Sequence, residues 1–138
     1  MKPQEMSIFP AGEANDQFAA YFIGQSYLAM LSNEQVVIGN VTFEPGCRNH
    51  WHIHRADRGG GQMLIVTAGE GWYQEWGREP QKLKAGVIVH IPAGVKHWHG
   101  AAADAWFQHL ALEVPGENGK TEWCEPVSDE AYAALKEG

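Results

Sequence analysis

The chain has 138 residues, a net charge of −7 and a composition that is 44% hydrophobic and 20% charged. Its length is typical of one globular domain, so we expect a single domain over residues 1–138. The negative charge and the lack of a Lys/Arg cluster argue against nucleic acid and anionic membranes as partners, and favour a small molecule. With 2 cysteines and no apolar leader or membrane-spanning run, the sequence predicts a cytoplasmic protein.

The N-terminal half is predicted to consist of short β-strands, because glycines and prolines punctuate it throughout. Ile8-Phe9 is predicted to form an edge strand, and the polar stretch AGEANDQ after it a loop. Residues 21–31 and 35–43 are rich in aromatic and β-branched side chains, which favours two strands. The apolar run over residues 62–69 predicts another strand, which ends at a hairpin-like break in Gly69-Glu70-Gly71.

The C-terminal half continues this pattern, with strands expected within residues 72–77, 82–94, 95–102 and 106–114. After Pro126 the pattern changes, because Ser128 is a good N-cap, acidic residues follow in the first turn, and Ala and Leu come next. These features predict one short terminal helix in the segment SDEAYAALKE. About eight to ten short strands without a linker or long repeat predict an all-β sandwich or barrel.

Histidines recur at alternate positions along the predicted strands. Six of the 7 histidines fall into three groups: His50, His52 and His54; His97 and His99; and His109. Within one strand, residues two apart share a face, so each group would point to one side of the sheet. A single buried histidine is most often a core residue, but several unpartnered imidazoles in one apolar interior would be costly. A metal ion uses their lone pairs, and the pattern therefore predicts a metal site.

The first histidine group resembles the first motif of the cupin superfamily, here over residues 46–69. Gly46 precedes His52-Ile53-His54, and an apolar strand leads from Gln62 to Gly69. The segment RADRGGG between His54 and Gln62 is longer than in the generic motif, and Gln62 stands where that motif has a glutamate.

The second histidine group resembles the second cupin motif, here over residues 86–97. Gly86 precedes Pro92-Ala93-Gly94, and His97 follows, whereas Ala101 stands where the motif has an asparagine. The paired motifs imply an all-β fold, the cupin double-stranded β-barrel or jelly roll, with the short helix after it. By position they also imply the metal ligands His52, His54, Gln62 and His97.

A denser resemblance is to small bacterial cupins with a three-histidine, one-glutamine metal site. Some of these are manganese-dependent hydroxynitrile lyases, and related sequences occur beside carboxymuconolactone decarboxylase domains. The shared segments include VTFEPG (41–46), WHIH (51–54) and KHWHGAA (96–102). This resemblance implies a homodimer, one divalent transition metal ion per chain, and His99 and His109 as catalytic residues near it. Manganese is suspected, and iron, nickel, cobalt, copper and zinc remain open.

The chemistry of Gln62 can be considered without the family. An amide oxygen brings no charge to a divalent ion, so three imidazoles and Gln62 would leave the site cationic. Such an ion is a strong Lewis acid and attracts anions. With open coordination positions, this site suits a lyase of the hydroxynitrile-lyase type acting on a small hydroxylated or carbonyl compound. The alternatives are a cupin dioxygenase, a non-catalytic metal-dependent binder of small ligands, and an accessory subunit.

Other residues have simpler interpretations. His50 is expected either at the barrel rim or close behind the metal ligands, and Cys47 is expected to be a buried apolar side chain rather than a reactive thiol. Arg55 and Arg58 are expected to be solvated loop charges, although they could meet a carboxylate at the pocket mouth. Five tryptophans are expected in the core or at a dimer contact rather than as substrate platforms: Trp51, Trp72, Trp98, Trp106 and Trp123.

Overall fold

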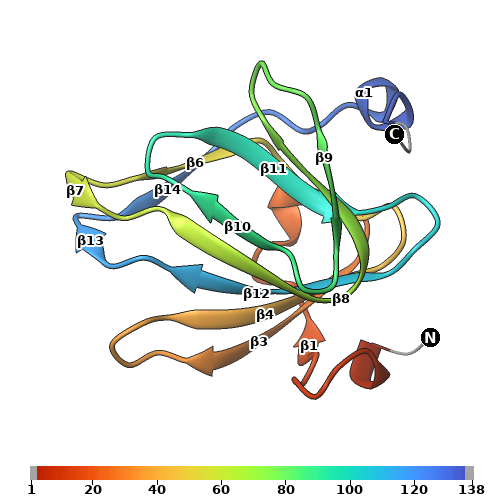
Figure 1. Ribbon diagram of the computed structural model, residues 1–138, viewed down its shortest axis with the longest axis horizontal. Helices are drawn as coiled ribbons and strands as arrows, with labels where there is room; N and C mark the ends of the chain where they lie inside the picture. Colours follow the sequence, from red (N-terminus) through yellow and green to blue (C-terminus); the bar gives the residue numbers. More distant parts are fainter. Residues whose placement is uncertain (1–2, 136–138) are drawn as a thin grey trace.

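Antiparallel strands dominate the structure, a computed structural model that describes residues 3–135 (Figure 1). The strands are β1 (Glu13–Ala14), β2 (Phe22–Ile23), β3 (Ser26–Ser32), β4 (Ile38–Phe43), β5 (Arg48–Asn49), β6 (His52–Arg55), β7 (Arg58–Gly59), β8 (Gln62–Glu75), β9 (Gln81–Lys84), β10 (Ile88–Ile91), β11 (Lys96–Ala101), β12 (Phe107–Glu113), β13 (Gly116–Glu117) and β14 (Lys120–Trp123). Short 3-10 turns span Pro3–Glu5 and Ala19–Tyr21, and the helix α1 spans Asp129–Ala133. The expected all-β class with one short C-terminal helix is confirmed.

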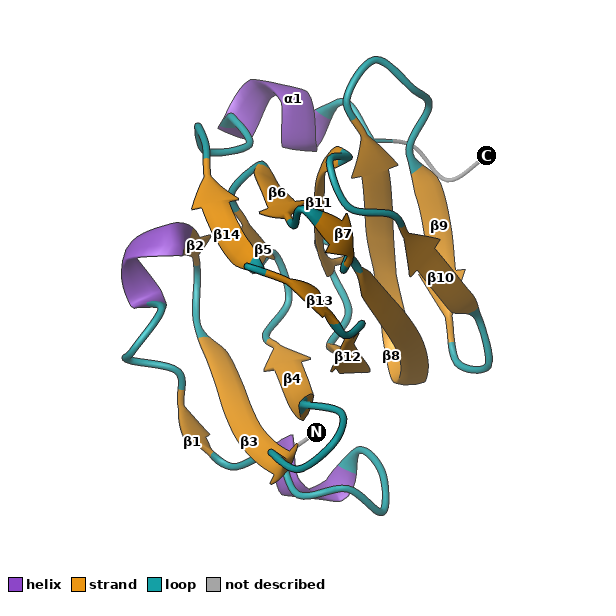
Figure 2. Ribbon diagram, turned by 90° about the vertical axis from the view of Figure 1, so that its left-hand side faces the viewer, coloured by secondary structure: helices purple, strands orange, loops and turns teal. Residues whose placement is uncertain are grey.

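The long strand β8 connects the two halves of the barrel. Up to Gly69 it pairs with β12 and β10, and from Glu70 onward it pairs with β11 and β9. The first half-barrel continues from β12 through β4 and β3 to β1, whereas the second contains β11, β5, β6, β14 and β2. The two halves curl toward each other, as Figures 1 and 2 show. Side chains from both halves can therefore meet in one interior.

The predicted hairpin-like break at Gly69-Glu70-Gly71 is wrong, because β8 runs through it. Gly69 has a φ of +77°, and a Cβ there would lie 1.9 Å from the carbonyl oxygen of Trp106. Only glycine fits such a close backbone approach at a positive φ. The strand therefore bends from one half of the barrel into the other while its pairing continues on both sides.

Two predictions for the N-terminal part also need correction. Ile8-Phe9 forms no strand, and Ile8 is 93% exposed. The edge strand is β1, in the stretch expected to be a loop, where Glu13 pairs with Leu28 of β3. The strand expected over residues 21–31 is divided into β2 and β3, which pair with different halves of the barrel.

The core follows the alternation of the strands. Leu64 and Val66 of β8 point inward and are buried, and they belong to a cluster that contains Phe43 and Phe107 from the neighbouring strands. A second cluster on the outer face of the second half-barrel joins Trp72 and Trp98 to residues near α1. Within residues 3–135, no helix has the length and hydrophobicity that crossing a membrane requires.

The C-terminal segment is held against this outer cluster by polar contacts. The hydroxyl of Ser128 accepts a hydrogen bond of 3.1 Å from the backbone N–H of Ala131, which confirms the predicted N-cap. The buried guanidinium of Arg48 donates to the carbonyl of Val127 and to the carboxylate of Asp129, at 2.9 and 2.7 Å. The last residues of the predicted helix, 136–137, lie outside the described residues.

A run of three glycines leads the chain from β7 into β8. Gly59, Gly60 and Gly61 all have a positive φ, and a Cβ on Gly61 would lie 2.4 Å from the carbonyl oxygen of Ile91. The short strand β7 pairs with β13, so the long insertion after His54 is an ordered ribbon. Its glycines allow the chain to pass close to neighbouring backbone and to begin β8 at Gln62.

We expect Gly61→Ala to destabilise the fold more than Gly77→Ala. Both positions have a positive φ, but nothing lies within 4 Å of a Cβ on Gly77. Gly77→Ala, the control, should lose about 1 kcal/mol of unfolding free energy through backbone strain. Gly61→Ala should lose a further ~1–3 kcal/mol through the clash. Urea denaturation measures both, and equal losses would contradict a role for the close approach.

Candidate metal centre

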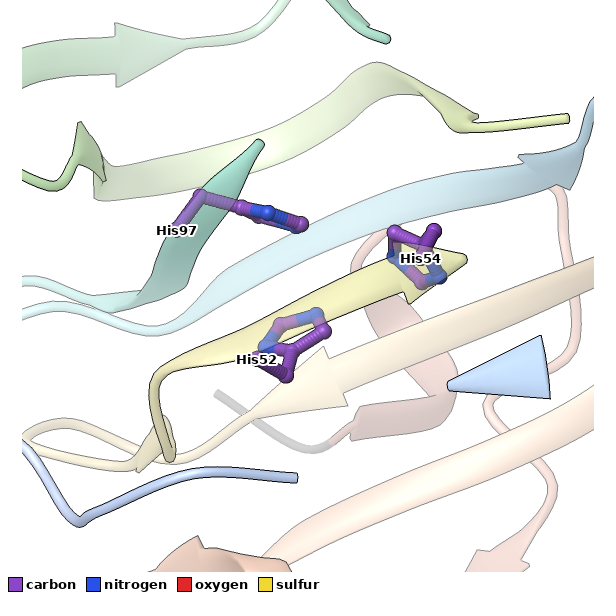
Figure 3. Close-up of side chains that lie close together, drawn as sticks. All are labelled: His52, His54 and His97. Carbon is purple, nitrogen blue, oxygen red and sulfur yellow. The ribbon is translucent and has the colours of Figure 1, made fainter. Parts of the chain in front are cut away.

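Three histidines meet in the interior of the barrel. His52 and His54 lie on β6, and His97 lies on β11, directly opposite His52 in the strand register. All three are buried, and one candidate ligand nitrogen from each lies within 4.8 Å of the others. Figure 3 shows the three rings close together, from two strands. This separation allows one ion to contact all three.

Hydrogen bonds orient two of these rings. Nδ1–H of His52 donates to the carbonyl of His50 at 2.8 Å, and Nδ1–H of His97 donates to the carbonyl of Val95 at 2.9 Å. Each ring therefore carries its lone pair on Nε2, as metal-binding histidines commonly do. Nε2 of His54 and of His97 is buried without a hydrogen-bond partner in the described structure.

Burial keeps these imidazoles neutral. It lowers the pKa of His52 well below the ordinary value, with neighbouring His97 and His54 adding to the effect. Burial also lowers the pKa of His97 to about 4. The pKa of His54 is lowered by burial too, although the carboxylate of Glu113 and the neighbouring side chain of Gln62 oppose the change. A neutral imidazole is the form that binds a metal ion.

Gln62 reaches the same region as the first residue of β8. Its Nε2–H donates to Oε1 of Glu113 at 2.7 Å, whereas its own Oε1 is buried without a partner. Gln62, His52 and His54 line one cavity. An amide oxygen and three imidazole nitrogens, without a thiolate, form a donor set suited to a divalent transition metal. These buried unpartnered atoms fit a metal ion.

His99 and His109 form a hydrogen-bonded pair beside the histidine cluster. Nδ1 of His99 on β11 lies 3.1 Å from Nε2 of His109 on β12. The His99 ring centre is 5.6 Å from that of His52, so the pair is adjacent to the cluster. Burial lowers the pKa of His99 well below its usual range and that of His109 to about 4. Both rings are therefore neutral at physiological pH.

Asn49 holds His99 in place. Its Oδ1 accepts the backbone N–H of His99 at 2.9 Å, and its amide nitrogen then faces the His99 ring at 3.3 Å. Since the amide oxygen is already occupied by a donor, the NH₂ end faces the ring and lies equally far, 3.3 Å, from Nδ1 and Nε2. Asn49 therefore limits the ring orientations that His99 can adopt.

The cavity has a volume of about 250 Å³ and two kinds of lining. Its polar residues are His52, His54, Gln62, His99, His109, Asn15, Asn49, Glu113 and Thr121. Its apolar residues include Phe18, Phe22, Leu28, Met30, Val37, Val41, Ala111 and Trp123. A larger open groove beside the turn between β8 and β9 contains none of these histidines. The cavity could hold a small molecule with one polar and one apolar end.

The six residues predicted for the site are thus brought together. Five line the cavity, and His97 lies against His52, with ring centres 4.2 Å apart. His50 does not share a strand face with His52 and His54, because β5 ends at Asn49 and β6 begins at His52. Its backbone carbonyl instead accepts the hydrogen bond from Nδ1–H of His52.

The expectations for Cys47, Arg55 and Arg58 agree with the structure. Cys47 is buried in the core, and burial raises the pKa of its thiol to about 12. Arg55 forms an exposed ion pair with Glu122, at 2.9 Å, and Arg58 lies 3.8 Å from Glu117. Both arginines are surface charges near the rim of the barrel.

Among the cavity residues that the sequence did not identify, three contact the predicted site residues. Glu113 shares strand parity with His109, so the alternation of β12 would have identified it. The expectation that Trp123 lies in the core or at a dimer contact is wrong: it lines the cavity, with its ring centre 4.8 Å from that of His52, because β14 pairs with β6. Asn49 reaches it through the pairing of β5 with β11. Local sequence carries no signal for the last two contacts.

Comparisons with known proteins agree with this architecture. The family model described as the cupin domain matches residues 39–110. An (R)-mandelonitrile lyase from Granulicella tundricola is 44% identical over 93 residues, which cover 67% of this chain and 68% of that protein. A cupin-like protein from Thermotoga maritima is 38% identical, with a TM-score of 0.82 over 96% of this chain and 98% of that one.

More distant structures share the fold alone. A DMSP lyase from Ruegeria pomeroyi has a TM-score of 0.60 at 18% identity, covering 94% of this chain and 61% of that chain. The family model spans more than half of the chain and includes both histidine motifs. The chain belongs to the cupin family.

Proposed function

We propose that this cupin is a metal-dependent lyase of the hydroxynitrile-lyase type. The observation that carries the proposal is the set of buried, unpartnered Nε2 atoms of His54 and His97 and Oε1 of Gln62, beside a neutral histidine pair. A divalent ion held by His52, His54, Gln62 and His97, manganese in this proposal, would act as a Lewis acid on the substrate hydroxyl. The 44% identical (R)-mandelonitrile lyase supports this class of reaction.

The residues of the cavity supply the remaining functions. His99 is neutral and takes the proton of the cyanohydrin hydroxyl at Nε2. Its Nδ1 is hydrogen-bonded to Nε2 of His109. As the carbon–cyanide bond breaks, its electron pair leaves with cyanide, and the hydroxyl carbon becomes a carbonyl. Cyanide then receives the proton from His99, which restores the neutral ring. Asn49 holds that ring in position.

The apolar lining fits an aromatic or alkyl substituent on the substrate. Leu28, Val41 and Trp123 are among its members, and they contact the space beside the histidines. A cupin dioxygenase and a non-catalytic binder would use the same candidate ligands. The lyase is favoured because the relative at 44% identity is named for a lyase activity.

We further propose that the chain is a single cytoplasmic domain that assembles as a homodimer. The outer face of the first half-barrel supports the dimer, because Met63, Ile65 and Leu110 alternate with inward-facing residues there. Ile88, paired with Ile65, is 52% exposed. Two copies of this uncharged stripe could pack sheet on sheet.

The metal prediction concerns stoichiometry. The purified chain should contain about one divalent ion per chain, and metal should raise its melting temperature, because ligands from different strands must come together. The double substitution His52→Ala, His54→Ala should remove the ion. His90→Ala, at an exposed histidine outside the cluster, should keep it. Elemental analysis measures the metal content of the wild type and of both variants, and thermal unfolding with and without metal measures the melting temperature. A full equivalent of metal in the double variant would place the site elsewhere.

The catalytic prediction concerns His99. The metal-loaded chain should release benzaldehyde from mandelonitrile, and His99→Gln should lower kcat by about 10²- to 10⁴-fold while keeping the metal. His90→Gln serves as the control. Absorbance of the released aldehyde measures the rate. A wild-type chain that binds the metal but leaves cyanohydrins intact and consumes oxygen with a small substrate would support the dioxygenase instead.

The pH prediction concerns the metal-free protein. The folded pKa of His109 is about 4, below its unfolded value near 6.5, so the unfolded chain binds more protons between these pH values. The unfolding free energy therefore does not depend on this histidine's titration above pH 6.5. As the pH decreases below 6.5, the unfolding free energy falls by up to about 1.4 kcal/mol per pH unit for each such histidine. Urea unfolding in chelator should show a smaller slope in His109→Phe than in wild type. An unchanged slope would contradict this assignment.

A further inference from the structure

A carboxylate lies directly behind Gln62, the neutral member of the proposed ligand set. Glu113 is the last residue of β12 and stands opposite Gln62 in the strand register. Nε2–H of Gln62 donates to Oε1 of Glu113 at 2.7 Å. The Glu113 residue is exposed at the rim of the cavity, whereas Gln62 is buried.

This contact selects one of the two orientations of the amide. The two ends of a glutamine amide have nearly the same shape, but only the oxygen has lone pairs available to a metal ion. An ionised carboxylate accepts hydrogen bonds and cannot donate one. Glu113 therefore holds the NH₂ end of Gln62 at the rim, and Oε1 is left buried and unpartnered.

We propose that Glu113 is a positioning residue that directs and polarises the amide oxygen of Gln62 toward the metal. A hydrogen bond to a charged acceptor is stronger than a neutral one and draws positive charge onto the amide nitrogen, which makes the oxygen a better donor. Carboxylates behind metal-binding histidines act in the same way on an imidazole. The inference rests on the proposed metal site, but it is independent of the reaction.

The neighbouring acidic residues make different contacts. Glu117 lies 3.8 Å from Arg58, and Glu122 forms an ion pair with Arg55 at 2.9 Å. Glu113 is the carboxylate at this rim whose described hydrogen bond is to Gln62. Removing Glu117 changes the net charge as much as removing Glu113 does, so Glu117→Ala is a matched control.

The first test measures the affinity for manganese(II) by competition with a chelator. Glu113→Ala should weaken binding about 10- to 100-fold, the usual effect of removing a group that supports a ligand. Glu117→Ala should change it by less than about twofold, since exposed charges contribute little. Glu113→Gln, which keeps an acceptor oxygen without the charge, should fall between wild type and Glu113→Ala. Melting temperatures of the metal-free variants check that each one folds.

The second test repeats the substitution in a Gln62→Glu background. A carboxylate at position 62 can use either oxygen, so it needs no orientation by Glu113. Glu113→Ala should therefore change manganese binding by much less in this background than in wild type. Such a background-dependent effect in a double-mutant cycle does not arise from a general loss of structure, which would weaken binding in both backgrounds.

The outcomes separate the inference from the metal site itself. If Glu113→Ala weakens binding equally in both backgrounds, Glu113 acts only through its charge or through the fold, and the inference is wrong. An unchanged affinity in Glu113→Ala would also overturn it, while leaving the metal site intact. If Gln62→Ala binds manganese as wild type does, the proposed ligand set fails, and the role of Glu113 fails with it.

Discussion

The burial of unpartnered nitrogen and oxygen atoms in one cavity is the constraint on which this site depends. Nε2 of His54, Nε2 of His97 and Oε1 of Gln62 are all buried without a protein donor in the described residues. Each such atom costs about 1–3 kcal/mol when it is left unsatisfied. A folded protein tolerates this cost where a ligand satisfies several atoms at once, and their convergence from β6, β8 and β11 fits a cation.

The barrel brings these atoms together through a few backbone features. β8 must pass from one half-barrel to the other without a break, which Gly69 permits, and it must begin with Gln62 beside β12. The glycines before Gln62 allow the insertion to pack against Ile91. The long insertion and Gln62, the proposed neutral ligand, are therefore linked. The loop that is longer than in the generic motif leads directly to the residue that replaces the motif's glutamate.

The alternation of strand side chains explains why much of the site could be predicted. His52 and His54, and likewise His97 and His99, share a face because β6 and β11 are regular strands. The parity that would place His50 on the same face does not hold, since an irregular segment separates β5 from β6. Periodicity assumes a continuous strand and gives no warning of such an interruption. Periodicity also does not reveal that β8 is one strand, because the glycines at 69 and 71 could mark either a turn or a close backbone approach.

The contacts across strands could not be predicted, because they depend on which strands pair. Trp123 meets His52 through the pairing of β14 with β6, and Asn49 meets His99 through β5 and β11. These partners are far apart in sequence and carry no motif. The candidate metal ligands can therefore be recognised from spacing, whereas the residues that orient them appear only with the fold.

The pairing of Gln62 with Glu113 changes the electrostatic interpretation of the site. Considered alone, a neutral glutamine leaves a divalent ion with its full charge, which favours anions. With Glu113 in place, a negative charge remains nearby, but it lies behind the amide at the rim, separated from the ion by the length of that group. Coulomb energy falls with distance and with solvent exposure, so this carboxylate reduces the field at the ion less than a directly bound glutamate would. In the proposed site, the amide would thus transmit part of the donor strength of a carboxylate while the site stays cationic toward a small anion, a combination that suits the proposed release of cyanide.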